Sequence, residues 1–392
     1  MGHDAIRNSY YSVTMKNIVN ILFSIVALFG VFACEGHIEQ PNGEIQIDLP
    51  KDGYIFFDSQ VATRGTLVEN TMPYDFGVVG YMYSGTNWTG YRAKAKPNVF
   101  SSGNQLVEWN DETLSHNYTP LVPWEEGQTY TFFAYYPWGL DFSNKGAGLP
   151  SGKDYEGTPF VTYTVHHTNS ENHKDVMTAQ VINTDPSVRS VSLHMVHRLS
   201  AVSAYARSYV NKGVFDALKN TDKEVYVKIN SVNITFDGIV YDKAEIPLDE
   251  DERIKSSLVN TSSFSYDFTY TDPLRFFDSA DKQVDITGGG KAMIFIPQDI
   301  QKNDNDEDVP IICKVTVEYD LIDAGNNTIW DTVYPEGTPN PPSKIQTRQI
   351  ELEKLDPKVH YYLILNFTKT GLTVDATKAV AWDDKPVEYE FE

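Results

Sequence analysis

Alternation of apolar and polar residues with a period of two is the feature that most constrains the fold of this chain. It is clearest over Ile311–Leu321, where each odd-numbered residue is apolar and most of the intervening ones are polar. Successive side chains of a strand point to opposite faces, so this pattern predicts a strand with one buried face. The same alternation recurs over Ile45–Leu49, Thr129–Tyr136, Val191–Tyr205 and Val225–Phe236. Asn211–Asn220 is the one segment that fits a short surface helix instead.

The strand segments are separated by turn-rich stretches, which favours antiparallel sandwiches. Aromatic residues make up 13% of the chain, and its 25 glycines and 20 prolines gather in stretches such as Ser143–Gly148 and Gly337–Pro342. We therefore predict an all-β protein with two tandem β-sandwich domains. The polar turn Asn183–Ser187 predicts the boundary, with an N-terminal sandwich over 65–187 and a C-terminal sandwich over 188–392.

An apolar segment near the start of the chain predicts export as a lipoprotein. Lys16 is followed by the uncharged run Ile18–Phe32, and Val31-Phe32-Ala33 leads into Cys34. The run is short for a membrane-spanning helix and has the flanks of a signal peptide, although an uncleaved anchor is the alternative. We expect residues 1–33 to be upstream residues plus a signal peptide, Met1–Thr14 to precede the true start, and Cys34 to carry lipid.

Charge and cysteine content exclude several classes of partner and structure. The 54 acidic residues outnumber the 32 basic ones, which gives a net charge of −22 and disfavours nucleic acid. Lipid on Cys34 leaves Cys313 without a partner inside the chain, so no disulfide is expected. Cys313 lies in an apolar segment, which predicts a buried structural thiol rather than a reactive one.

Motifs for catalysis or cofactor binding are incomplete. Gly288–Ala292 lacks two residue types that a phosphate-binding loop needs and predicts a hairpin turn instead. Asp304, Asp306 and Asp308 imitate the start of a calcium loop, but Val309 replaces its turn glycine, so an acidic surface loop is favoured. No nucleophile or acid–base pair can be chosen. We expect no cofactor and no enzymatic activity.

A cluster of three histidines and one separate histidine are candidate site residues. His166, His167 and His173 could hold a metal if their segment folded back, but adjacent histidines of a strand point to opposite faces, and surface positions are favoured. His197 continues the apolar face of a strand. It is therefore predicted to be half-buried and hydrogen-bonded, in a packing role.

Several weak motifs follow one another along the chain: the Cys34 lipobox, Ala62–Thr66, Phe76–Tyr81, Tyr130–Pro137, Asp175–Met177, Leu193–Val202, Ile294–Gln298, Tyr361–Leu363 and Val380–Trp382. In this order they together resemble the fimbrillin family, the pilus subunits that Bacteroidales export as lipoproteins. Asp356–Lys358 departs from the glycine turn that similar proteins often have, which affects a loop.

The resemblance implies two transthyretin-like β-sandwich domains and assembly by strand exchange. In such a family the lipidated precursor reaches the outer membrane, and an arginine-specific protease cuts upstream of the first domain. The removed segment had been a strand, so its loss opens a groove. The C-terminal strand of a neighbouring subunit then fills that groove.

The residues themselves fit this scheme at both ends of the chain. Arg64 and Gly65 lie among small residues, as an accessible cleavage site would. The leader 34–64 carries strand patterns at Glu44–Leu49 and Tyr54–Phe57. In the C-terminal segment 386–392 the apolar residues Val387, Tyr389 and Phe391 alternate with glutamates, as in a donor strand. The alternatives are a terminal strand that completes its own domain and an ordinary loop arginine.

The expected function is therefore a structural subunit of a cell-surface fimbria that supports adhesion. Its partners would be other fimbrillin subunits, including anchor or tip subunits, and the outer membrane through the lipid on Cys34. The alternative is a surface carbohydrate-binding lipoprotein that does not polymerise. Its candidate residues are Trp88, Trp109, Trp124 and Trp138, although packing in the core is favoured for each.

Overall fold

The structure is a computed structural model. All the residues that it describes belong to the compact unit Asp48–Glu392. They are residues 53–61, 70–71, 74–92, 95–144, 159–188, 190–208, 225–238, 240–257, 263–277, 283–287, 292–302, 305–334, 336–339, 341–368 and 371–379.

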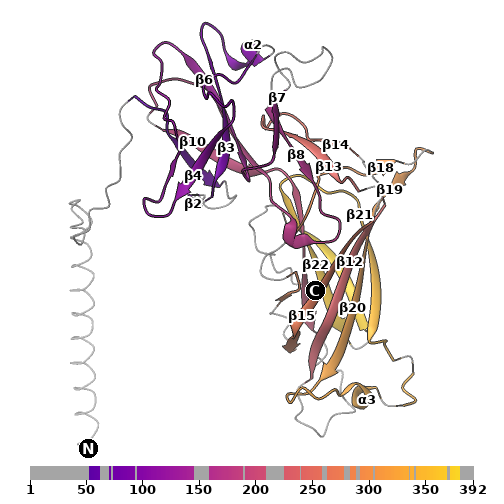
Figure 1. Ribbon diagram of the computed structural model, residues 1–392. Coiled ribbons are helices and arrows are strands. Elements are labelled where there is room, and N and C mark those ends of the chain that lie inside the picture. Colours follow the sequence, from indigo (N-terminus) through magenta and orange to yellow (C-terminus); the bar gives the residue numbers. More distant parts are fainter. Residues whose placement is uncertain are drawn as a thin grey trace, which may run out of the picture. The chain divides into compact units, whose positions relative to one another are not determined.

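The largest sheet has eight strands, in the order β2-β1-β10-β9-β6-β3-β4-β5 (Figure 1). All its pairings are antiparallel except that of β1 with β10, which is parallel. The strands are β1 (Phe57–Val61), β2 (Asn70–Thr71), β3 (Phe76–Tyr83), β4 (Gln105–Asn110), β5 (Ser115–Asn117), β6 (Thr129–Tyr136), β9 (Met177–Thr184) and β10 (Val191–His197).

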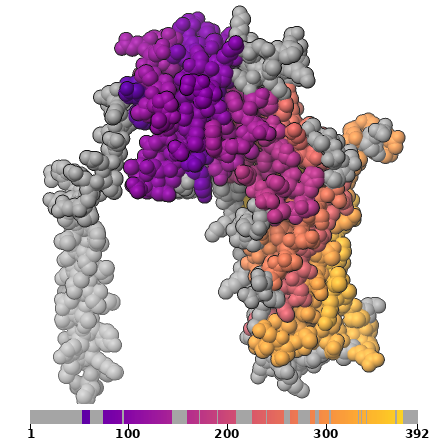
Figure 2. Space-filling view, in the orientation of Figure 1, coloured from indigo at the N-terminus to yellow at the C-terminus, as the bar shows by residue number. Residues whose placement is uncertain are grey.

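A four-stranded sheet, in the order β14-β13-β8-β7, joins segments that lie far apart in the sequence. Its central pair is antiparallel and aligns Pro247 with Phe160. Figure 2 shows the magenta atoms of the β8 region against the coral atoms of the region that contains β13. The strands are β7 (Asp141–Asn144), β8 (Pro159–Thr164), β13 (Lys243–Pro247) and β14 (Lys255–Ser257).

Two further sheets face each other around the C-terminal core, in the orders β16-β11-β22-β23, with β17 also paired to β11, and β15-β12-β20-β21. Their strands are β11 (Ser200–Ser208), β12 (Tyr226–Asp237), β15 (Phe264–Phe277), β16 (Val284–Asp285), β17 (Met293–Phe295), β20 (Ile311–Ile322), β21 (Ile345–Leu352), β22 (Val359–Thr368) and β23 (Gly371–Ala379). A small hairpin pairs β18 (Gln301–Lys302) with β19 (Asp308–Val309).

The described helices are short: α2 (Trp88–Tyr91), the 3-10 turn η2 (Ser170–Asn172) and α3 (Trp330–Val333). The all-β prediction is therefore confirmed, and the transthyretin-like topology remains a prediction. The predicted helix at Asn211–Asn220 lies outside the described residues. No helix of the described segments is long and apolar enough to cross a membrane.

β6 confirms the predicted strand Thr129–Tyr136, but its two faces are both buried. Phe132 packs in the smaller of two hydrophobic cores, with Phe57 and Leu193. Phe133 packs in the larger core, with Val161. A strand covered on both faces needs no polar side, which explains the nearly continuous aromatic sequence of this segment.

Gly77 allows the eight-stranded sheet to pack closely against its own aromatic side chains. A Cβ atom at this position would overlap the ring of Tyr135 on β6, which pairs with β3. Gly80, three residues later, faces Val99 and Phe100 in the same way. Both glycines of this segment are therefore needed for close packing, because any side chain would displace a neighbour.

The alternation predicted over Ile311–Leu321 is present in β20. Ile311, Cys313, Val315 and Val317 are at most 2% exposed, and the intervening residues are partly exposed or at the surface. Cys313 is fully buried, and burial raises its pKa to about 12. The predicted structural thiol is confirmed.

The predicted single strand Val191–Tyr205 is two strands, which separate at Arg198 and Leu199. β10 pairs with β1 and β9, whereas β11 pairs with β22, β16 and β17. In the sequence, Leu199 and Ala201 continue the apolar spacing of β10 across the break, so the pattern does not reveal it. In the structure β10 alternates in burial, whereas β11 is buried at nearly every position. The domain boundary near residue 187 remains a prediction.

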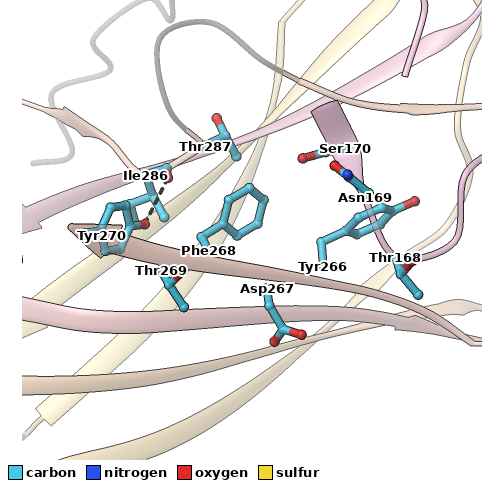
Figure 3. Close-up of a pocket in the computed structure, with 10 residues that line it drawn as sticks. All are labelled: Thr168, Asn169, Ser170, Tyr266, Asp267, Phe268, Thr269, Tyr270, Ile286 and Thr287. Carbon is cyan, nitrogen blue, oxygen red and sulfur yellow. Dashed lines mark hydrogen bonds between the residues drawn. The ribbon is translucent and has the colours of Figure 1, made fainter. Parts of the chain in front are cut away.

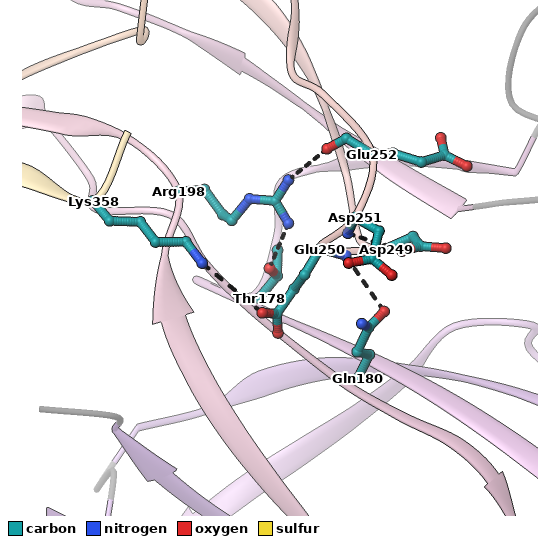
Figure 4. A network of polar contacts seen from close by, with 8 residues as sticks. All are labelled: Thr178, Gln180, Arg198, Asp249, Glu250, Asp251, Glu252 and Lys358. Carbon is teal, nitrogen blue, oxygen red and sulfur yellow. Dashed lines mark hydrogen bonds and ion pairs between the residues drawn. The ribbon is translucent and has the colours of Figure 1, made fainter. Parts of the chain in front are cut away.

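Arg198 stands at this break and is only 4% exposed. Its guanidinium donates to Thr178 Oγ1 and to the Glu252 carbonyl, both at 3.1 Å (Figure 4). Burial lowers its pKa, and the nearby carboxylates of Glu250 and Asp249 oppose that effect. The turn between β13 and β14, which carries four consecutive acidic residues, is thus folded around one buried cation.

Candidate functional site

β1, the first strand of the described chain, is the candidate functional element because it lies upstream of Arg64 and pairs within the largest sheet. It lies between β10 and the two-residue strand β2, with Phe57 beside Val191 and Val61 beside Met195 in parallel register. The Val191 amide also donates to the Phe56 carbonyl at 2.8 Å. β1 is thus an integral strand of the sheet.

Side chains from one face of this segment fill the smaller core. Ile55 and Ser59 are fully buried and Phe57 is 5% exposed, whereas Asp58 is at the surface. The Phe57 ring contacts three aromatic rings, with centroid distances of 5.3 Å to Phe132, 5.7 Å to Tyr118 and 6.1 Å to Phe100. Burial of Ile55 and Phe57 stabilises the fold by roughly 1.5–3 kcal/mol each.

Hydrogen bonds from the segment before β6 hold the start of this strand. The Ile55 amide donates to the Val122 carbonyl at 2.9 Å, and Tyr118 Oη donates to the Ile55 carbonyl at 2.9 Å. The Trp124 amide donates to the Gly53 carbonyl at 2.8 Å. Burial raises the pKa of Tyr118 to about 12, so its hydroxyl remains a donor at physiological pH.

His116 of β5 reaches β1 although β5 is the last strand of the sheet order. Its Nε2 lies 3.4 Å from Ser59 Oγ, and its ring packs against Phe76 and Trp109, with centroids 4.9 Å away in each case. The sheet therefore curls until β1 meets its far end. Sequence reasoning missed both Ser59 and His116, because a lone serine and a lone histidine carry no pattern.

Of the residues predicted for processing and strand exchange, the structure describes only the leader segment Tyr54–Phe57. Tyr54–Phe57 is partly confirmed as strand: Tyr54 forms an isolated bridge with Pro123, and the regular strand begins at Phe57. The segment Glu44–Leu49 lies outside the described residues. So do the predicted lipidation, cleavage and donor-strand residues Cys34, Arg64, Gly65, Val387, Tyr389 and Phe391.

The histidine cluster is held by the protein itself. His173 Nδ1 accepts from the Ile294 amide at 2.6 Å, and its Nε2 lies 2.9 Å from the His166 carbonyl, to which it donates. Burial lowers the His173 pKa to about 4, so the ring is neutral and both nitrogens are occupied. His173 is therefore a packing residue and not the surface histidine we predicted. No group of three or more potential ligands in the described segments could hold a metal.

His197 behaves as predicted. Its side chain is 10% exposed, and Nδ1 makes a short hydrogen bond with Asp175 Oδ2. Ser203 and His360 form the pair that most resembles a nucleophile and base, with Oγ 2.9 Å from Nε2. Ser203 is only 2% exposed and lies in the middle of β11, so no substrate can reach it.

The four candidate tryptophans differ in exposure. Trp88 is 3% exposed and belongs to the larger core, and Trp124 packs against the smaller one. Trp109 donates its indole N–H to Asp111 at 2.7 Å. Trp138, which we expected in the core, is 37% exposed and stacks on Tyr135. The four do not form a common surface platform.

Comparisons with known proteins agree with the fold. A family model described as fimbrillin-like matches residues 63–331. A fimbrial protein from Bacteroides vulgatus ATCC 8482 is similar over 83% of this chain and 99% of its own, at 17% identity and a TM-score of 0.57. A putative cell adhesion protein from Bacteroides ovatus ATCC 8483 is similar over 86% and 99%, at 12% identity and a TM-score of 0.47. No curated protein matches the chain.

Proposed function

Because this chain belongs to the fimbrillin-like family, we propose that it is a structural, non-enzymatic subunit of a cell-surface fimbria and polymerises by exchange of β1. In this proposal a protease cuts between Arg64 and Gly65. The C-terminal strand of a second copy or of another fimbrial subunit then replaces β1. The observation that supports it most directly is that β1 is a buried strand ending three residues before Arg64.

Cleavage at Arg64 would leave β1 attached by noncovalent contacts alone. Its loss would expose the pocket around Phe57, lined by Phe100, Tyr118 and Phe132, and one hydrogen-bonding edge of β10. Unpaired strand edges bind other strands readily, because every backbone N–H and C=O needs a partner. The vacated groove therefore favours a replacement strand over solvent.

The C-terminal segment has the pattern that this groove requires. Val387, Tyr389 and Phe391 alternate with glutamates, as Ile55, Phe57 and Ser59 alternate with more exposed residues in the native strand. Each apolar side chain that becomes fully buried would contribute about 1.5–3 kcal/mol. A donor strand with a large residue at all three inward positions would bury more apolar surface than β1, which has a serine at one of them.

Lipid on Cys34 would connect processing to release from the membrane. Cys34 precedes Arg64, so the cut would separate the lipidated leader from the sandwich domains. The uncut precursor would stay at the outer membrane with its groove closed by β1. A Cys34→Ala chain should fail to incorporate labelled fatty acid, and unchanged labelling would remove this part of the proposal.

The central experiment treats the purified full-length chain with an arginine-specific protease. We expect a mature N-terminus at Gly65 and a ladder of SDS-resistant multimers. Arg64→Ala should keep β1 and remain monomeric. Multimers that form from the Arg64→Ala chain without cleavage would exclude β1 release as the trigger.

A truncation after Trp382 tests the donor separately. The truncated chain should be cut at Arg64 and remain folded, yet form no multimers. If it unfolds, the C-terminal segment completes its own sandwich. If it still forms the ladder, another segment is the donor.

A further inference from the structure

A pocket that no residue of β1 lines opens at the edge strand β15. It has a volume of about 480 Å³, within the range of roughly 300–1,000 Å³ that small-molecule sites occupy. The lining comes from β15, from the loop that leads into η2 and from the residues after β16 (Figure 3). The lining residues are Thr168, Asn169, Ser170, Tyr266, Asp267, Phe268, Thr269, Tyr270, Ile286 and Thr287.

The pocket lies at one edge of the C-terminal sandwich, and side-chain hydrogen bonds join the two sheets at the opposite edge. At the opposite edge, Arg348 of β21 donates to the Leu372 carbonyl of β23, and Gln346 accepts from the Leu372 amide at 2.9 Å. At the β15 edge the Tyr270 hydroxyl donates to the Ile286 carbonyl at 2.9 Å. β15 is the outermost strand of its sheet, so no further described strand covers the opening.

Phe268 lines this pocket with part of its ring and packs with the rest against the larger hydrophobic core. Tyr266, Phe268 and Tyr270 project to one side of β15 and Asp267 and Thr269 to the other (Figure 3). The Tyr266 hydroxyl donates to the His166 carbonyl at 2.9 Å, so both tyrosine hydroxyls are engaged. The half-buried Phe268 ring stacks on no aromatic ring of the described segments.

The pocket lining carries several hydroxyl groups and no basic group. The side-chain hydroxyls of Thr168 and Ser170 bond to no described protein group. No lining residue is basic. Asp267, the one charged lining residue, projects away from the ring and accepts from Asn233 at 2.7 Å. The interior therefore combines an aromatic face with neutral hydroxyls.

We propose that this pocket binds one residue of a neutral carbohydrate. The apolar face of a sugar ring matches the Phe268 ring, and its hydroxyls match those of Ser170 and Thr168. An anionic ligand would lack a basic partner and would meet a protein of net charge −22. A purely apolar ligand would leave the surrounding hydroxyls without water or partners. The site would give a fimbrial subunit a binding specificity that polymerisation alone does not provide.

The test uses the full-length Arg64→Ala chain, which keeps the inference separate from processing. A glycan array identifies ligands, and ligand-observed NMR then measures the methyl glycosides of glucose, galactose and mannose, with glucuronic acid as the charged comparison. We expect binding to neutral sugars and none to glucuronic acid. Failure of every neutral glycan on both assays would overturn the proposal.

Two variants and a matched control locate the binding. Phe268→Leu keeps apolar volume but removes the aromatic face, so affinity should fall by about tenfold. Ser170→Ala changes a surface loop without altering the core, and should also weaken binding several-fold. Ser263→Ala removes an exposed hydroxyl just before β15, outside the pocket lining, and should leave affinity unchanged. Binding that survives in both Phe268→Leu and Ser170→Ala would place the sugar elsewhere.

Discussion

Replacing Arg198 by methionine tests how far a buried cation supports the junction of β10 and β11. Methionine keeps an apolar stem of similar length but removes the guanidinium that bonds Thr178 and Glu252. Asp249, which is 3% exposed, and the half-buried Glu250 would lose their buried counter-charge. Removing one partner of a buried ionic group costs about 3–5 kcal/mol, because the remaining charge stays desolvated.

Arg92 provides the control, since it approaches the same acidic turn from the surface. Its guanidinium lies 4.0 Å from Asp249 and 3.7 Å from Glu252, and its side chain is 32% exposed. Exposed pairs contribute about 0–1 kcal/mol, so Arg92→Met should have a small effect. Both variants remove one positive charge near the same carboxylates. A difference between them therefore reports burial and not net charge.

Thermal unfolding of the full chain, followed by circular dichroism, measures both variants. A loss of 3–5 kcal/mol should lower the Tm of Arg198→Met by roughly 5 °C in a unit of the size of Asp48–Glu392. Adding Asp249→Asn should restore part of the loss, because it neutralises an unpaired carboxylate while keeping its shape. Equal Tm values for Arg198→Met and Arg92→Met would refute the reasoning, as would an absence of rescue.

Three more outcomes follow from buried groups. Because the His173 pKa is lowered in the folded protein, the unfolded chain binds the proton at a higher pH than the folded chain does. The free energy of unfolding should therefore fall by up to about 3 kcal/mol between pH 6.5 and pH 4. Denaturant titrations should show that His173→Gln flattens this pH dependence. Cys313 should react with a maleimide only after unfolding, and rapid labelling of the native chain would contradict its burial. Gly77→Ala should cost about 1–3 kcal/mol through overlap with Tyr135; an unchanged midpoint of urea unfolding would show that this ring can move.

The class of fold was predictable because alternation is a local property. β20 reproduces the predicted strand Ile311–Leu321 almost to the residue, and β6 matches Thr129–Tyr136. The division of Val191–Tyr205 into β10 and β11 was not predictable. The apolar spacing of β10 continues in the sequence through Leu199 and Ala201. The break is marked only by the change of strand partners and by the buried contacts of Arg198.

The candidate site was predictable only in part, for a similar reason. The pattern of Tyr54–Phe57 indicates a strand upstream of Arg64, and the structure places that strand inside the sheet. Ser59 and His116 meet because the sheet curls, which no local pattern encodes. The β15 pocket joins β15 to a loop that lies more than 90 residues earlier in the sequence, as the hydrogen bond from the Tyr266 hydroxyl to the His166 carbonyl illustrates.

The two proposed sites differ in what they can bind, and that difference has a consequence for a fimbria. The groove under β1 offers a strand edge and a deep aromatic pocket around Phe57, which suit an extended chain with alternating apolar side chains. The β15 pocket offers the Phe268 ring and a few hydroxyls, which suit a single sugar ring. Binding at one sugar pocket would be weak, because few contacts are made. Strand exchange would repeat that pocket once per subunit along the fibre, so a surface with many copies of the same sugar would be held far more tightly by a polymer than by a monomer.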